Sequence, residues 1–199
     1  MKGEHISGVV EGIVDEAITR TLLEHVGCVA GTMYVQGGKP RLLEKLAGFN
    51  SAARFSPWLV LVDLNGDAPC APEFVSAVMP KPSPQMVFRV AVRQAEAWLM
   101  GDAQELASYL RVSQARVPDD PEGEGDAKQA MVNIARNSRN RNVREDMVPT
   151  PASGRRTGPN YAGRLIEFAT QRWRPAVAAE RVDSLNRCLQ RLAVPQCGD

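Results

Sequence analysis

The pattern of apolar and polar positions in the first half of the chain favours strands that alternate with helices. The predicted strands cover residues 5–10, 28–35, 58–62 and 86–92. The third of them reads Trp-Leu-Val-Leu-Val and contains no polar residue, which is typical of a strand buried on both faces.

Residues with helical spacing fill the gaps between these strands. The predicted helices cover residues 17–26, 41–55, 72–79, 93–100 and 102–109. Gly27 stands where a helix end favours a left-handed residue, and Asp102 with Glu105 has the spacing of a capping box. Strands that alternate with helices predict an α/β fold whose sheet is mainly parallel and flanked by helices.

The second half of the chain favours helices and loops. Residues 112–126 are rich in Pro, Gly, Asp and Glu and predict a loop, as do residues 147–160. The predicted helices cover residues 127–139, 161–172 and 176–192. We therefore expect three parts: an α/β core over residues 1–111, an acidic loop over 112–126, and an Arg-rich helical C-terminal extension over 127–199 that packs on the core.

The 199-residue chain has a net charge of +1, but its charges are unevenly distributed. Residues 1–135 carry 12 basic and 17 acidic side chains, whereas residues 136–174 carry nine arginines and three acids. Such a basic segment indicates an anionic partner such as nucleic acid, although a solvated helix face gives the same composition. The arginines expected to contact nucleic acid are Arg136, Arg139, Arg141, Arg144, Arg155 and Arg156.

The composition argues against several classes of protein. Hydrophobic residues make up 44% of the chain and charged residues 24%, which is ordinary for a globular protein. No run approaches the ~20 apolar residues of a membrane span, and the N-terminus shows no secretion signal, so we expect a cytoplasmic protein without membrane contact. The four cysteines are widely spaced and accompanied by two histidines, which argues against a zinc cluster or a disulfide scaffold.

Carboxylates follow two of the predicted strands at the point where each strand ends. Glu11 follows the first strand, and Asp63, Asn65 and Asp67 follow the third. Functional groups gather at the carboxyl ends of parallel strands, and a divalent cation offsets the repulsion between neighbouring carboxylates. Glu11, Asp63 and Asp67 are therefore a candidate Mg²⁺ site, although Asp-Leu-Asn-Gly-Asp also has the composition of a tight turn. No P-loop, dinucleotide-binding or serine-nucleophile motif is present.

Three segments of the sequence resemble a known family. They read VEGIVDE over residues 10–16, WLVLVDLNGD over 58–67 and RVAVRQAEAWLMGD over 89–102. A glutamate after a first strand and acids after a later buried strand resemble the Toprim fold of topoisomerases, bacterial primases and overcoming-lysogenization-defect nucleases. More closely, the chain resembles the Toprim-like bacterial domain-of-unknown-function family 4276, and the third segment is the most specific part of this resemblance.

The resemblance implies roles for the acids at the strand ends. Glu11 corresponds to the glutamate that acts as general acid/base or metal ligand, and Asp63 to the first metal-binding aspartate. Asn65 stands where the second aspartate is usual. Because an amide is a neutral ligand, the site would hold Mg²⁺ (or Mn²⁺) less strongly or use Asp67 instead.

Four further acids have supporting roles under the same resemblance. Asp15 and Glu16 could add a carboxylate from the helix that follows the first strand. Glu96 and Asp102 belong to the third segment, where we expect a helix cap and a buried partner for Arg93.

The activity implied by the resemblance is Mg²⁺-dependent phosphodiester hydrolysis by a nuclease, with the Arg-rich segment on the nucleic-acid backbone. It also implies an effector that works beside a partner ATPase in defence against phage. Two alternatives stay open. The chain could be a catalytically degenerate module that binds nucleic acid or protein, or it could act on a small phosphorylated molecule.

Overall fold

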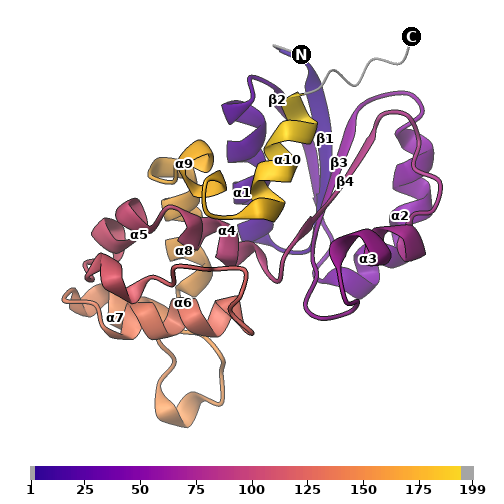
Figure 1. Cartoon of the computed structure of the whole chain (residues 1–199). Helices are drawn as coiled ribbons and strands as arrows, with labels where there is room; N and C mark the ends of the chain where they lie inside the picture. The colour runs from indigo at the N-terminus through magenta and orange to yellow at the C-terminus, as the bar shows by residue number, and fades with distance from the viewer. Residues whose placement is uncertain (1–2, 194–199) are drawn as a thin grey trace.

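The computed structural model describes residues 3–193 and contains, in that range, a four-stranded sheet (Figure 1). All neighbouring strands are parallel, and their spatial order is β2-β1-β3-β4. The strands are β1 (His5–Val10), β2 (Val29–Val35), β3 (Trp58–Asp63) and β4 (Met86–Ala91). The predicted α/β fold with a parallel sheet is confirmed.

Helices cover both faces of this sheet. α1 (Ile13–His25) and α10 (Asp183–Ala193) lie on one face, and α2 (Lys39–Ala52) and α3 (Ala71–Val78) lie on the other (Figure 1). Burial on both faces explains why β3 is apolar along its length, with only Asp63 partly exposed at its end. The two faces bury separate apolar clusters.

The remaining helices form a group beside the carboxyl ends of the strands (Figure 1). This group comprises α4 (Ala95–Gly101), α5 (Ala103–Leu110), α6 (Ala127–Arg136), α7 (Arg141–Met147), α8 (Tyr161–Gln171) and α9 (Pro175–Ala179), with short 3₁₀ turns at Gln114–Arg116 and Pro151–Ser153.

This helical group shares its core with the first half of the chain. Trp98 of α4 is fully buried, and its carbonyl accepts a hydrogen bond from the indole of Trp173. α8 packs along α1, where the Thr21 hydroxyl donates to the Ala169 carbonyl at 3.1 Å. The apolar cluster under α1 therefore continues without interruption into the C-terminal helices.

The acidic loop at residues 112–126 is fastened to the start of α10. The Glu122 carboxylate accepts hydrogen bonds from the backbone amides of Asp183 and Ser184. The Arg181 guanidinium donates to the carbonyls of Pro118 and Asp119. These contacts place an acid at the N-terminus of α10, where negative charge is stabilising.

Two predicted helix boundaries in the second half are wrong. The helix expected over 127–139 ends at Arg136, because Ser138 bonds the Leu110 carbonyl and Asn140 caps a new helix, α7. The helix expected over 176–192 is divided at residues 180–182 into α9 and α10. The Glu122 carboxylate accepts hydrogen bonds from the first backbone amides of α10 and so stabilises a separate helix start there.

Among residues 3–193, no helix has both the length and the apolar character needed to cross a membrane.

Candidate functional site

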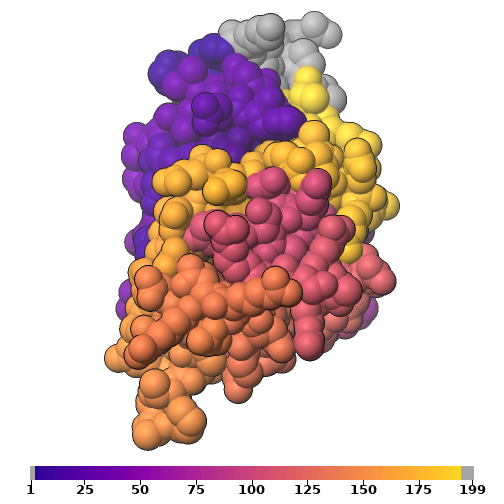
Figure 2. Space-filling view, turned by 90° about the vertical axis from the view of Figure 1, so that its left-hand side faces the viewer, coloured from indigo at the N-terminus to yellow at the C-terminus, as the bar shows by residue number. Residues whose placement is uncertain are grey.

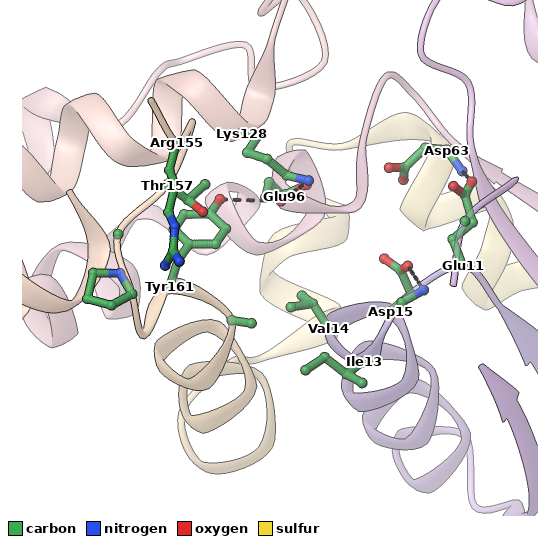
Figure 3. Close-up of a pocket in the computed structure, with 15 residues that line it drawn as sticks. Glu11, Ile13, Val14, Asp15, Asp63, Glu96, Lys128, Arg155, Thr157 and Tyr161 are labelled. Carbon is green, nitrogen blue, oxygen red and sulfur yellow. Dashed lines mark hydrogen bonds and ion pairs between the residues drawn. The ribbon is translucent and has the colours of Figure 1, made fainter. Parts of the chain in front are cut away.

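A pocket of about 560 Å³ opens at the carboxyl edge of the sheet, between the strand ends and the C-terminal helices (Figure 3). Segments that are far apart in the sequence form its walls. They are the β1–α1 turn with the start of α1, the β2–α2 turn, the end of β3, α4, α6, and the segment that leads into α8 with the start of that helix. The lining residues are Glu11, Gly12, Ile13, Val14, Asp15, Gly38, Asp63, Glu96, Lys128, Arg155, Thr157, Gly158, Pro159, Tyr161 and Ala162.

Backbone amides fix the carboxylates at the two strand ends. Glu11 follows β1, and its Oε1 accepts a hydrogen bond from the Asp63 amide at 2.9 Å. Asp63 ends β3, and its Oδ1 accepts from the Ala95 amide at 2.8 Å. Each carboxylate therefore has one oxygen held by the fold, and neither has a basic partner among the described residues.

Two more carboxylates enter the pocket from helices. Asp15 lies in the first turn of α1, and its Oδ2 accepts from the Gly12 amide at 2.8 Å, which caps the helix. Glu96 of α4 is only 4% exposed. Its Oε1 accepts from the Tyr161 hydroxyl at 3.3 Å and lies 3.6 Å from the Lys128 ammonium.

Burial and mutual repulsion disfavour the charged forms of these groups. Burial raises the pKa of Asp15 to about 7, and the nearby charges of Glu96 and Glu11 add to this shift. Burial also raises the pKa of Asp63 well above its usual value, with Asp15, Glu96 and Glu11 as further causes. The pocket thus concentrates more carboxylates than its one ammonium partner, Lys128, offsets.

The wall opposite the carboxylates is basic and apolar. Figure 3 shows Arg155, Thr157 and Tyr161 across the pocket from Asp15, Asp63 and Glu11. The Arg155 side chain is exposed and makes no ion pair with any of residues 3–193. Burial, followed by the neighbouring Glu96, raises the pKa of the Tyr161 hydroxyl well above its usual value, so Tyr161 is a hydrogen-bond donor at neutral pH.

The donor set fits a hard divalent cation. Carboxylate oxygens are the ligands that Mg²⁺ and Mn²⁺ prefer, and Mg²⁺ usually keeps several waters beside one or two carboxylates. Glu11, Asp15 and Asp63 each present such oxygens to the pocket. Within residues 3–193, no three acidic, His or Cys side chains lie close enough together to hold a metal ion by themselves, so a cation bound here would take most of its ligands from water.

The structure places two predicted metal ligands outside the pocket. Asn65 has a left-handed backbone with φ of +52°, and Gly66 follows with φ of +83°. The chain therefore turns here, and the Asp67 amide donates to the Leu64 carbonyl. The Asp67 carboxylate pairs with the Lys39 ammonium. This is the tight turn that the sequence left open as the alternative interpretation.

Two predicted supporting acids also lie outside the pocket. Glu16 forms an ion pair with Arg20 one turn further along α1. Asp102 is fully buried, accepts from the Glu105 amide as an N-cap, and binds the Arg174 guanidinium. Its capping role is confirmed. Neither acid pairs with Arg93 in the described part of the chain: Asp102 binds Arg174, because the C-terminal segment folds back onto the start of α5, and Glu96 lies beside Lys128 and Tyr161.

Of the six arginines expected to bind nucleic acid, Arg155 lines the pocket. Arg141 pairs with Glu145 along α7, and Arg156 pairs with Asp126. The Arg144 side chain bonds the Ser138 carbonyl, so it fastens the α6–α7 turn. The exposed Arg136 and Arg139 complete the set on the helical group.

Sequence reasoning missed three polar residues of the pocket, Lys128, Thr157 and Tyr161. Lys128 and Tyr161 lie 117 and 150 positions after Glu11, and no motif connects them to the strand ends. One signal was available for Lys128, since it is one of only five lysines in an Arg-rich chain. Tyr161 offered none, because a tyrosine at the start of a helix is commonly a packing residue.

Comparisons of the chain with protein-family models, with curated proteins and with solved structures found no match. The candidate function therefore depends on the geometry and chemistry of the pocket.

Proposed function

We propose that this protein hydrolyses phosphodiester bonds with the help of a divalent cation held in the carboxylate pocket. The observation that supports this function is the concentration of Glu11, Asp15, Asp63 and Glu96 around one pocket with a single lysine partner. Carboxylates without enough basic partners repel each other, and a divalent cation relieves that repulsion.

The carboxylates would bind the cation, and the opposite wall of the pocket would bind the phosphate. Glu11 and Asp63 would hold Mg²⁺ through the oxygens that the backbone leaves free, and Asp15 lies beside them to bind a coordinated water. When bound, Mg²⁺ would neutralise phosphate charge and position the attacking water. Arg155 faces this group from the opposite wall and would bind a non-bridging phosphate oxygen (Figure 3).

The test is metal-dependent cleavage by variants that differ in one carboxylate. We expect wild-type protein to cleave single- or double-stranded DNA or RNA with Mn²⁺ or Mg²⁺, and Asp63→Asn to lose at least ~100-fold of that rate, because it removes a charged ligand. Asp67→Asn is the matched control, since Asp67 ends the same turn but pairs with Lys39 outside the pocket. Equal losses in both variants would contradict the assigned site.

A catalytically degenerate binding module is the second candidate. The observation in its favour is that Asn65 and Asp67, the second pair of expected ligands, lie in a turn outside the pocket. Calorimetric titration separates the two candidates. A degenerate site binds neither Mn²⁺ nor Mg²⁺ at millimolar concentration, whereas the hydrolase binds metal and loses this binding in Asp63→Asn.

The phosphodiester chemistry is proposed for this chain alone. A partner ATPase and a role in defence against phage stay expectations from the family resemblance.

A further inference from the structure

The pocket has a polar floor that lies well below its mouth. Glu96 is 4% exposed, whereas Glu11, Asp15 and Asp63 are partly exposed in the same pocket. A phosphate that approaches Glu96 must therefore enter the pocket. The volume of about 560 Å³ is in the range of small-ligand pockets, ~300–1,000 Å³, and suits one nucleotide unit with a hydrated cation.

Apolar side chains also line the pocket beside the carboxylates. Ile13, the first residue of α1, is 54% exposed, although it is a large apolar side chain. Val14, Pro159 and Ala162 line the same pocket. The exposed part of this isoleucine side chain offers contact area to the sugar or base of a nucleotide.

The segment over residues 148–160 supplies the only arginine of the pocket lining. It projects at the lower edge of the molecule (Figure 2), and Arg155 extends from it toward the pocket (Figure 3). Because Arg155 makes no ion pair with residues 3–193, its guanidinium is available for a phosphate. Arg155 lies far along the chain from Glu11 and Asp63 but lines the same pocket. The second half of the chain therefore completes the binding site.

We propose that the pocket binds one nucleotide unit of single-stranded nucleic acid, with a phosphate between Arg155 and the carboxylates and the sugar or base against Ile13. This inference rests on the proposed function and names its substrate. A duplex keeps its bases stacked and its backbone on a stiff helix, so its phosphates reach a recessed floor only after local opening. A single strand splays a nucleotide outward without that cost.

The experiment measures binding of fluorescent 12-nucleotide DNA and RNA strands, and of the matching duplexes, by anisotropy. Ca²⁺ replaces Mg²⁺, because it takes the same oxygen ligands. We expect the single strands to bind at least ~10-fold more tightly than the duplexes, because opening a duplex costs a few kcal/mol. Comparing the DNA strand with the RNA strand shows which of the two nucleic acids the pocket binds more tightly. A preference for either one supports the inference.

Two exposed positions test the walls of the pocket. We expect Arg155→Gln and Ile13→Ala each to weaken single-strand binding by about five-fold, since each removes one contact worth about 1 kcal/mol. Arg187→Gln and Phe55→Ala are the matched controls, because Arg187 pairs with Asp183 on α10 and Phe55 is 86% exposed after α2. Thermal unfolding of all four variants verifies that each is folded, and Arg155→Lys tests the need for a guanidinium.

The binding results test this inference, and the cleavage results test the proposed function, so the failure of one can be told from the failure of the other. Equal binding of duplex and single strand, or binding unchanged by Arg155→Gln and Ile13→Ala, overturns the inference even if Mn²⁺-dependent cleavage is found. Single-strand preference with both losses supports the inference, and a wild-type protein that then cleaves neither DNA nor RNA overturns the hydrolase alone.

Discussion

At the scale of single residues, Asp15 shows what the pocket does to a carboxylate. It caps α1 through the Gly12 amide, yet burial and the charges of Glu96 and Glu11 raise its pKa from 3.8 to about 7. A carboxyl group whose pKa is higher in the folded state binds its proton more tightly there. Folding stability in the absence of metal therefore falls as the pH rises from about 4 to about 7 and levels off above that.

Asp15→Asn removes this pH-dependent cost. We expect the free energy of unfolding of the variant, relative to that of wild type, to increase as the pH rises. Measured with a chelator present, this difference should be about 2 kcal/mol larger at pH 8 than at pH 5. Urea unfolding at both pH values measures the difference. Glu16→Gln is the control, because Glu16 is paired with Arg20 on the solvent side of the same helix. A gain that is the same at pH 5 and pH 8 would contradict the assigned environment of Asp15.

At the scale of elements, Asp102 joins three segments of the helical group. It is fully buried, caps α5 through the Glu105 amide, and accepts hydrogen bonds from the backbone and guanidinium of Arg174 just before α9. Close packing accompanies this junction, since a Cβ on Gly101 would lie 2.7 Å from the Ala178 carbonyl oxygen. The junction therefore sets how α9 lies against α4.

Asp102→Ala removes both the cap and the ion pair. We expect it to lower the free energy of unfolding by about 2–3 kcal/mol, because a lost N-cap costs about 1 kcal/mol and buried hydrogen bonds add to it. Asp183→Ala is the control, since its pair with Arg187 is exposed and should contribute under about 0.5 kcal/mol. Chemical denaturation compares the two variants, and equal losses would show that the junction contributes little.

At the scale of the whole molecule, the pocket connects the sheet with the C-terminal helices. Its carboxylates come from the β1–α1 turn, β3, α1 and α4, while Lys128, Arg155 and Tyr161 come from the second half. A bound cation would interact with several of these elements at once. Metal binding should therefore stabilise the fold as a unit.

This gives a prediction for thermal unfolding with and without Mg²⁺. At ten times its Kd, Mg²⁺ should stabilise wild-type protein by about 1.4 kcal/mol, which raises the melting temperature by about 3 °C for a chain of this size. Asp63→Asn should lose this rise, and Asp67→Asn should keep it. NaCl at equal ionic strength controls for screening. A rise of the same size in Asp63→Asn would place the cation elsewhere.

The sequence predicted the strand ends correctly and only part of the pocket. Glu11 and Asp63 could be placed because the carboxyl ends of parallel strands meet at one edge of a sheet. Asn65 and Asp67 could not, because two consecutive left-handed residues turn the chain away from the pocket and Lys39 holds Asp67. Asp15 and Glu96 were identified as supporting acids, and the structure brings both into the pocket.

By itself, the sequence determined the α/β class, the buried third strand and the acids that end two strands, because hydrophobic periodicity and turn residues act over a few positions. The tertiary structure decided the rest. Only the packing of α8 on α1 brings Tyr161 and Arg155 opposite the strand ends, and only the return of the chain to α5 gives Asp102 its partner, Arg174. These contacts join residues 65 to 148 positions apart, and no local pattern in the sequence specifies which distant side chains will meet.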